Sequence, residues 1–249
     1  MSTRRDFARF GLTAAAAALS PFIPIQAQAL SQKKKIVCIG GHPDDPETGC
    51  GGTLALFALA GHDVTIIYLT RGEAGIPGKS HEAAAGIRSL EAQAAAKILN
   101  AKPVFAGQID GDTVFNTQWI QKLKALVDAE QPDLLFTHWP IDSHKDHQVA
   151  SLLTIQCWTG MQRKPGLYFF EVCTGNQTQG FKPTDYIDIT TTRAQKKKAV
   201  YCHTSQGPDE IYRSAECNHE LMETFRGVEI GVGAAEAFVK MSGSSLPLL

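Results

Sequence analysis

The first candidate site is the polar cluster Gly41-His42-Pro43-Asp44-Asp45-Pro46-Glu47, which holds one imidazole and three carboxylates within six residues. It follows the apolar run 36–40 and precedes the glycine-rich run 48–53. This order predicts a buried strand, a tight polar turn and the start of a helix. A solvated loop needs no such cluster, whereas a divalent metal ion with an attached water does. The cluster therefore indicates a metal-dependent hydrolase site.

A second polar cluster, Asp142-Ser143-His144-Lys145-Asp146-His147, also follows an expected strand and opens an expected helix. Any one of these histidines alone is explained as a surface group. Two clusters at two strand ends, however, can converge on one ion. A hydrolytic zinc site uses three nitrogen or oxygen ligands and leaves one position for water. From the two clusters we predict three metal ligands: His42, Asp45 and His147.

Three further side chains of the clusters are predicted to take part in the chemistry. The metal lowers the pKa of its water to about 7, and Asp44 is placed to accept the proton as a general base. His144 could stabilise the developing oxyanion or protonate the leaving amine. Asp146 could orient His144 and stabilise its charged form.

The elements that position the clusters alternate along the chain. Strands are expected at 36–40, 63–70, 103–106 and 133–137, and helices at 53–60, 81–99, 117–129 and 148–158. This alternation predicts an α/β fold, with a Rossmann-like, mostly parallel sheet flanked by helices. The C-terminal part is less regular, with strands expected at 167–172 and 186–189 and helices at 193–201 and 208–224.

The glycine-rich run 48–53 is not interpreted as a nucleotide site. It lacks the GxGxxG spacing of a dinucleotide-binding turn. The carboxylates just ahead of it would also repel a pyrophosphate.

The N-terminal residues 1–29 are interpreted as a twin-arginine signal peptide. Arg4 and Arg5 precede an apolar stretch at 10–25 and a small-residue cleavage site at 27–29. A membrane anchor is the alternative, but the stretch is short for a span and contains two prolines. We therefore predict a periplasmic or secreted protein whose single domain covers residues 30–249.

Charge and composition restrict the partners. The chain has 249 residues, of which 43% are hydrophobic, and a formal net charge of −1, as in an ordinary globular protein. The predicted signal peptide, residues 1–29, has three arginines and one aspartate. Residues 30–249 therefore have a net charge of −3 and no excess of basic residues to suggest nucleic-acid binding. The lysine runs 33–35 and 196–198 are interpreted as solvated faces. No later segment is apolar and long enough to cross a membrane, and the oligomeric state is left open.

The six cysteines are interpreted as buried free thiols because most lie in apolar runs. An oxidising compartment would nevertheless permit disulfides, whose pairing the sequence does not determine. These residues are Cys38, Cys50, Cys157, Cys173, Cys202 and Cys217.

Taken together, the two clusters resemble the motifs of the PIG-L/LmbE family of metal-dependent N-deacetylases. The first motif, (A/G)HPDD-x-E, stands here at 41–47, and the second, His-x-Asp-His, at 144–147. The similarity also runs through 49–53, 70–75, the Arg88…Glu91 helix and 203–206, and so covers most of the chain from residue 35 to about residue 206.

The resemblance implies an LmbE-like fold and the removal of acetyl groups from amino sugars or related N-acetyl compounds. It implies one divalent metal ion, Zn²⁺ by ligand type with Fe²⁺ as the alternative. The ligands would be His42, Asp45 and His147. The residues acting in catalysis would be Asp44 as base, His144 as stabiliser of the tetrahedral intermediate and Asp146 as the residue that tunes it.

Three further residues have two interpretations each. Arg88 resembles the family arginine that reaches the substrate pocket, but it could instead pair with Glu91 on its own helix. His203 could line the pocket or be a structural histidine. Glu47 is expected to cap the helix or to support the ligands from behind.

Two other functions remain open. One is a non-catalytic sugar-binding module on the same fold, although binding alone would not need the base Asp44 and the acid His144. The other is an amidase or esterase acting on a non-sugar acyl compound through the same chemistry.

Overall fold

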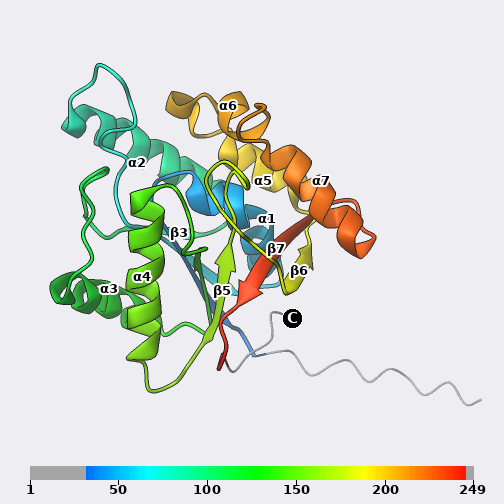
Figure 1. The fold of residues 1–249 in the computed structure, drawn as a ribbon, viewed down its shortest axis with the longest axis horizontal. Coiled ribbons are helices and arrows are strands. Elements are labelled where there is room, and N and C mark those ends of the chain that lie inside the picture. Colours follow the sequence, from blue (N-terminus) through cyan, green and yellow to red (C-terminus); the bar gives the residue numbers. More distant parts are fainter. Residues whose placement is uncertain (1–31, 245–249) are drawn as a thin grey trace, which may run out of the picture. The chain divides into compact units, whose positions relative to one another are not determined.

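The computed structural model describes residues 32–244, so the predicted signal peptide lies outside the described residues. Within them, no helix is long and apolar enough to cross a bilayer. A seven-stranded sheet runs in the order β3-β2-β1-β4-β5-β7-β6 (Figure 1). Its strands are β1 (Lys35–Gly40), β2 (Asp63–Tyr68), β3 (Lys102–Phe105), β4 (Leu134–His138), β5 (Gly166–Phe170), β6 (Asp185–Asp188) and β7 (Ala235–Lys240).

Helices cover both faces of the sheet (Figure 1). They are α1 (Asp45–Leu59), α2 (His81–Ile98), α3 (Thr117–Glu130), α4 (Lys145–Thr159), α5 (Arg193–Val200), α6 (Pro208–Tyr212) and α7 (His219–Ile230), with a 3₁₀ turn at Thr204–Gln206. The strands β1 to β5 pair in parallel, whereas β7 is antiparallel to both β5 and β6. The predicted α/β fold with a mostly parallel sheet is therefore confirmed.

The two faces have separate hydrophobic cores because side chains alternate along a strand. Ile36 and Cys38 of β1 pack with residues of α1, α2 and α5 on one face. Val37 and Ile39 pack with residues of α3 and α4 on the other. With both faces covered, β1 is buried and apolar after its first residue, Lys35, and polar residues follow only where the strand ends.

Helix α1 begins at Asp45, earlier than the expected start at 53, so the first motif itself opens the helix. Pro46 is tolerated in the first turn, where a helix has no amide partner to lose. The Asp44 amide donates to Glu47 Oε2 at 3.2 Å, which confirms the helix-capping interpretation of Glu47. The glycines that follow permit close packing, since a Cβ on Gly52 would lie 2.8 Å from the Ile189 side chain.

The C-terminal part differs from the prediction in two respects. The single helix expected at 208–224 is two helices, α6 and α7, because Asn218 Oδ1 accepts the Leu221 amide at 2.8 Å and starts a new helix. Strand β7 was not expected. It inserts between β5 and β6, and its pairing depends on residues far away in the sequence.

The prediction that all six cysteines are free thiols is wrong for one pair. Cys173 and Cys217 form a disulfide, with their Cα atoms 4.6 Å apart. The chain connection between α6 and α7 brings Cys217 to the loop that follows β5. The other four cysteines are free, as expected: Cys38, Cys50, Cys157 and Cys202.

A buried lysine joins the C-terminal elements to the helix that carries the first motif. Lys196 Nζ lies 2.8 Å from Glu223 Oε1 and 2.6 Å from Glu236 Oε1, and the lysine is 1% exposed. Glu236 also accepts the amides of Gly52 and Thr53 in α1, at 2.9 and 2.7 Å. Lys196 therefore belongs to a buried ion cluster and not to the solvated face that we expected for residues 196–198.

Replacing Lys196 with methionine is expected to lower the free energy of unfolding by about 3–5 kcal/mol. The substitution keeps the aliphatic stem but removes the cation that two buried carboxylates share, leaving Glu236 without its lysine and Glu223 with Arg193 alone, at 3.0 Å. Lys198→Met is the matched control because Lys198 is exposed on the same helix, and it should change stability by less than about 0.5 kcal/mol. Urea unfolding measures both variants, and equal stabilities would contradict the role given to Lys196.

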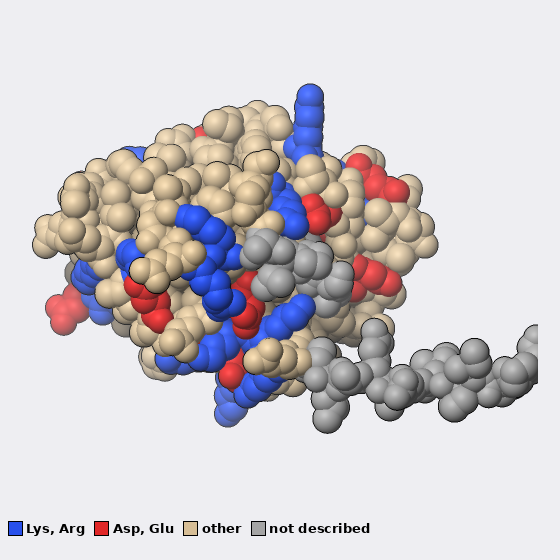
Figure 2. Space-filling model, turned by 90° about the horizontal axis from the view of Figure 1, so that it is seen from below, with Lys and Arg blue, Asp and Glu red and all other residues tan. Residues whose placement is uncertain are grey.

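The edge of the sheet where the parallel strands begin carries many charged groups of both signs. Figure 2 shows this edge with acidic side chains interspersed among the basic ones. Lys33 lies 2.7 Å from Asp63, and Lys102 lies 2.7 Å from Glu130. Acidic partners therefore accompany the lysines at this edge, as expected for a solvated face.

Candidate metal centre and active site

The carboxyl ends of the parallel strands surround a cavity of about 450 Å³. Its lining comes from the loops after β1 to β5 and from the segment that contains α6 and the start of α7. Both predicted polar clusters contribute to it, because β1 and β4 are neighbours in the sheet. The site lies where ligands of open α/β sheets are expected.

Asp45 lies at the centre of the predicted ligand set. Its Oδ2 is 3.1 Å from His42 Nδ1, and its Oδ1 is 3.2 Å from His147 Nε2. The structure thus brings the three predicted ligands together from two loops. Two imidazole nitrogens and a carboxylate are a donor set that suits a divalent ion such as Zn²⁺.

His138 is a fourth group at this centre, and our sequence reasoning assigned it no role. Its ring stacks on that of His147 with centroids 4.0 Å apart, and its Nε2 accepts the Gly41 amide at 3.0 Å. Burial and the neighbouring His147 lower the pKa of His138 to about 4, so the ring is neutral. Its position directly after the expected strand at 133–137 was the signal that could have found it.

Carboxylates hold the outer nitrogens of both ligand histidines. His42 Nε2 lies 3.1 Å from Asp110 Oδ1 and 3.1 Å from Asp146 Oδ2. His147 Nδ1 lies 3.3 Å from Asp142 Oδ1. Such partners orient the imidazoles and leave the other nitrogen of each ring available to a metal ion. Asp110 and Asp142 were missed as site residues, although each comes shortly after an expected strand end.

The contacts of the Asp146 carboxylate differ from the expected one, which was to His144. Its carboxylate contacts His42 and accepts from the Gly111 amide and the Thr113 hydroxyl, at 2.8 and 2.5 Å. It makes contact with His144 through its backbone amide, which donates to His144 Nδ1 at 3.3 Å. The reason is that Asp146 lies in the first turn of α4, whose N-cap is His144. The structure therefore assigns the Asp146 carboxylate to the orientation of His42.

Without a metal ion, the surrounding carboxylates favour the charged forms of His42 and His147. Burial by itself lowers the pKa of His147, but the Asp45 and Asp142 carboxylates raise it to about 9. Burial opposes the same effect at His42, where Asp45, Asp110 and Asp146 raise the pKa well above its usual value. Several buried carboxylates thus attract positive charge to this point, which is what a divalent cation would supply.

Metal uptake is therefore expected to strengthen as the pH rises towards about 9. Below the raised pKa of His147 the ion must displace a proton from that ring and another from His42. Its apparent affinity should rise by up to about 100-fold per pH unit, with about two protons released per ion. Titration of the metal-free protein with Zn²⁺ in weak buffer measures this release, and uptake without proton release would contradict the assignment.

Asp44 lies beside the centre in an unusual backbone conformation, with φ = 109°. A non-glycine residue adopts such a conformation only where its surroundings hold it. Arg88 Nη2 does so by donating to Asp44 Oδ2 at 2.9 Å and to the Pro43 carbonyl. Burial raises the pKa of the Asp44 carboxyl to about 6, although Arg88 opposes the rise.

Arg88 reaches this site and does not pair with Glu91. Glu91 instead accepts from the Thr204 hydroxyl and the Ser205 amide, both at 2.7 Å. Gly72 and Gly75 leave the space for the guanidinium, because a Cβ on either would overlap it. Arg88 also lines the cavity, as the resemblance implied.

His144 and His203 take different positions relative to the cavity. His144 lines it, with its ring centroid 4.7 Å from that of His42. Burial lowers the pKa of His144, so the ring is neutral. His203 is fully buried, with Nε2 3.5 Å from Glu47 Oε1, and is not among the lining residues. The expectation that His203 lines the pocket is therefore wrong, since Glu47 holds it behind the wall.

Comparisons with known proteins agree with this geometry. The profile of the PIG-L family, described as GlcNAc-PI de-N-acetylase, matches residues 37–158, a segment that includes both polar clusters. A diacetylchitobiose deacetylase of Thermococcus kodakarensis is 30% identical over 196 residues, which are 72% of each chain.

Solved structures share the fold. The N,N′-diacetylchitobiose deacetylase from Pyrococcus horikoshii matches with a TM-score of 0.76 and 28% identity, over 85% of each chain. A 4-carboxy-2-hydroxymuconate hydratase from Pseudomonas putida matches with a TM-score of 0.74 over 87% of this chain and 99% of its own. At 21% identity, the hydratase shows the fold alone.

Proposed function

The chain belongs to the PIG-L/LmbE family of deacetylases, and from this membership we propose that it removes an N-acetyl group from an amino sugar by metal-dependent hydrolysis. The observation that carries the proposal is the convergence of His42, Asp45 and His147 on one side of a cavity with Asp44 beside them. Two relatives are named as deacetylases of an N-acetylated disaccharide, which supports an amino sugar as the substrate class.

His42, Asp45 and His147 would hold one divalent ion, for which we propose Zn²⁺ because the donors are two nitrogens and a carboxylate oxygen. Fe²⁺ is the competing ion for such a set. When bound, the ion would lower the pKa of a water molecule and polarise the amide carbonyl. Elemental analysis of protein purified without added metal distinguishes the two ions.

Asp44 would act as the general base. Its side chain is held by Arg88 and lines the cavity next to the ligands. A carboxylate with a pKa near 6 is ionised at neutral pH and still basic enough to take a proton from an activated water. The same carboxyl group can then return that proton to the leaving amine.

His144 would donate to the oxyanion of the tetrahedral intermediate. Its Nδ1 accepts the Asp146 amide at 3.3 Å, so in the neutral ring the proton is on Nε2. A neutral imidazole that donates from Nε2 suits a developing negative charge. Asp146 contributes to this step through the backbone contact, while its carboxylate orients His42.

The test is the release of acetate from N-acetylglucosamine, a di-N-acetylated disaccharide and an acetyl ester. We expect release from the sugars that a chelator abolishes and added Zn²⁺ restores. Release from the ester alone would favour an esterase on the same site. Tight sugar binding without release from any compound, with the metal verified as bound, would favour a binding module.

We also propose export to the periplasm or beyond through the twin-arginine signal at 1–29. The disulfide Cys173–Cys217 supports this location, because such bonds persist in oxidising compartments. Cell fractionation with an Arg4→Lys/Arg5→Lys variant tests it. An unchanged distribution of the variant would contradict export by this route.

A further inference from the structure

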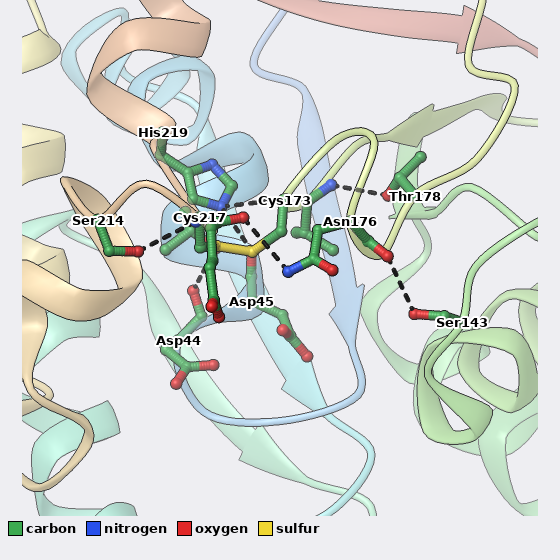
Figure 3. Close-up of a disulfide and its surroundings, with 12 residues drawn as sticks. Asp44, Asp45, Ser143, Cys173, Asn176, Thr178, Ser214, Cys217 and His219 are labelled. Atoms are coloured by element: carbon green, nitrogen blue, oxygen red, sulfur yellow. Dashed lines mark hydrogen bonds between the residues drawn. A yellow bond between two sulfur atoms is a disulfide. The ribbon is translucent and has the colours of Figure 1, made fainter.

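The cavity extends from the metal centre to a second group of side chains: Cys173, Cys217 and His219. Figure 3 shows the disulfide with His219 on one side and the Asp44 and Asp45 carboxylates on the other. The mechanism proposed above does not use this group.

Two separate loops supply this wall, the β5–β6 loop (residues 171–184) and the α6–α7 loop (residues 213–218). The disulfide joins them across 44 residues of sequence. Two long hydrogen bonds also connect the two segments, from the Cys173 amide to His219 Nε2 and from Asn176 Nδ2 to the Glu216 carbonyl, both at 3.4 Å. Because these bonds are weak, the disulfide is the strongest connection described between the two loops themselves, while the buried pair of Glu171 with Arg226 ties the start of the β5–β6 loop to α7.

The backbone conformation of Cys173 also indicates that the disulfide constrains the β5–β6 loop. Cys173 has φ = 42°, in the left-handed region that residues with a Cβ rarely adopt. Such a conformation persists only where the surrounding structure imposes it. The bond to Cys217 supplies that constraint at the point where the β5–β6 loop enters the cavity.

The far side of the β5–β6 loop rests on the metal centre. Thr178 Oγ1 donates to Asp142 Oδ2 at 3.1 Å, and Asp142 Oδ1 lies 3.3 Å from His147 Nδ1. The loop is therefore anchored at Thr178 by the centre and at Cys173 by the disulfide. Gln177, which lies between these anchors, lines the cavity.

We propose that the Cys173–Cys217 disulfide fixes a substrate-binding wall that contacts the part of the substrate remote from the reacting amide. Val172 and Gln177 of this wall, together with Gln206 and Ile211 of the segment ahead of the α6–α7 loop, give this part of the cavity both apolar and polar side chains. This mixture suits a sugar ring, which has apolar faces and hydroxyl edges. The substrate class is then an N-acetylated amino sugar that carries at least one further sugar residue. The inference rests on the proposed function.

The physical effect of the disulfide is preorganisation. A loop that is already held in its bound conformation does not lose conformational freedom when the ligand binds. Without the bond, the wall must be ordered at the expense of affinity for a ligand that reaches it. A ligand confined to the metal end of the cavity should be affected little.

The test compares sugar affinities with and without the disulfide, in an Asp44→Asn background in which turnover is too slow to consume the ligand during the measurement. We expect the Cys173→Ser/Cys217→Ser variant to bind N,N′-diacetylchitobiose about tenfold more weakly and N-acetylglucosamine less than about twofold more weakly. Metal content should not change. Cys202→Ser is the matched control, since Cys202 is a free thiol that does not line the cavity.

A phosphine reductant supplies a second measurement if the double variant folds poorly. It should weaken disaccharide binding in the protein with intact cysteines and have no effect on the double variant. The unreduced, denatured protein should titrate four thiols, the number of free cysteines in the structure. Six thiols would overturn the proposal.

Other outcomes also overturn the proposal. They are an unchanged disaccharide affinity in the double variant, an equal loss of affinity for both sugars, a loss of metal, or an absence of disaccharide binding both with and without the disulfide. Failure of the proposed function gives a different result, because the affinity difference between the two sugars would remain while the parent protein releases no amine.

Discussion

Replacing Asp45 with asparagine is expected to empty the metal centre and reduce kcat/KM by a factor on the order of 10⁴, because water activation and amide polarisation both depend on the ion. The Asp45 carboxylate faces His42 and His147 at 3.1 and 3.2 Å and also accepts the His42 amide at 2.7 Å. An asparagine of the same shape has no negative charge and turns an amide group towards one of the imidazoles. Metal content by elemental analysis and amine release measure the two effects.

Asp142→Asn is the matched control for Asp45→Asn. Asp142 faces the outer nitrogen of His147 and not the ion, at 3.3 Å. Losing such a partner typically weakens metal affinity by about 10- to 100-fold, and excess metal should restore turnover. An Asp45→Asn protein that keeps one tightly bound ion and full activity would remove Asp45 from the ligand set.

Replacing Asp44 with asparagine is expected to lower kcat by about 10²- to 10⁴-fold while the metal remains bound. Asparagine retains an oxygen that can accept from Arg88, so the loop geometry and the substrate affinity should change little. The loss would then lie in proton transfer. Asp112→Asn is a suitable control because Asp112 is an exposed carboxylate outside the cavity.

The pH profile gives Asp44 a second test. A general base must be ionised, so kcat/KM of the parent enzyme should fall as the pH drops below the pKa of Asp44. That pKa is raised to about 6 by burial in the metal-free protein, and a bound cation would lower it. The acid limb should therefore lie at or below about pH 6 and be absent from Asp44→Asn. A full acid limb in the variant would assign it to another group.

The sequence alone was sufficient to predict the fold class and to place His42, Asp45 and His147 in one site. Both depend on short-range patterns. A fully apolar run that ends in polar residues marks the carboxyl end of a buried parallel strand, and parallel strands place such ends at one edge of the sheet. His42 and His147 could therefore be assigned to one site although they lie on different loops.

Only the tertiary structure decided which groups support those residues. Asp110 and Asp146 meet at His42 because β3 and β4 lie on opposite sides of the β2–β1 pair and their following loops converge over it. His203 lies behind the cavity because Glu47, at the start of α1, holds it there. Contacts of this kind follow from strand order and loop paths, which leave no periodic signal in the sequence.

The same reason explains the C-terminal differences. Strand β7 is stabilised by pairing with β5 and β6, and Cys217 finds Cys173 only after α6 and α7 have packed. Neither partner lies within the short windows in which apolar periodicity can be recognised. Local chemistry therefore pointed to the proposed metal ligands, whereas the packing of distant segments determined their partners and the disulfide-linked wall of the cavity.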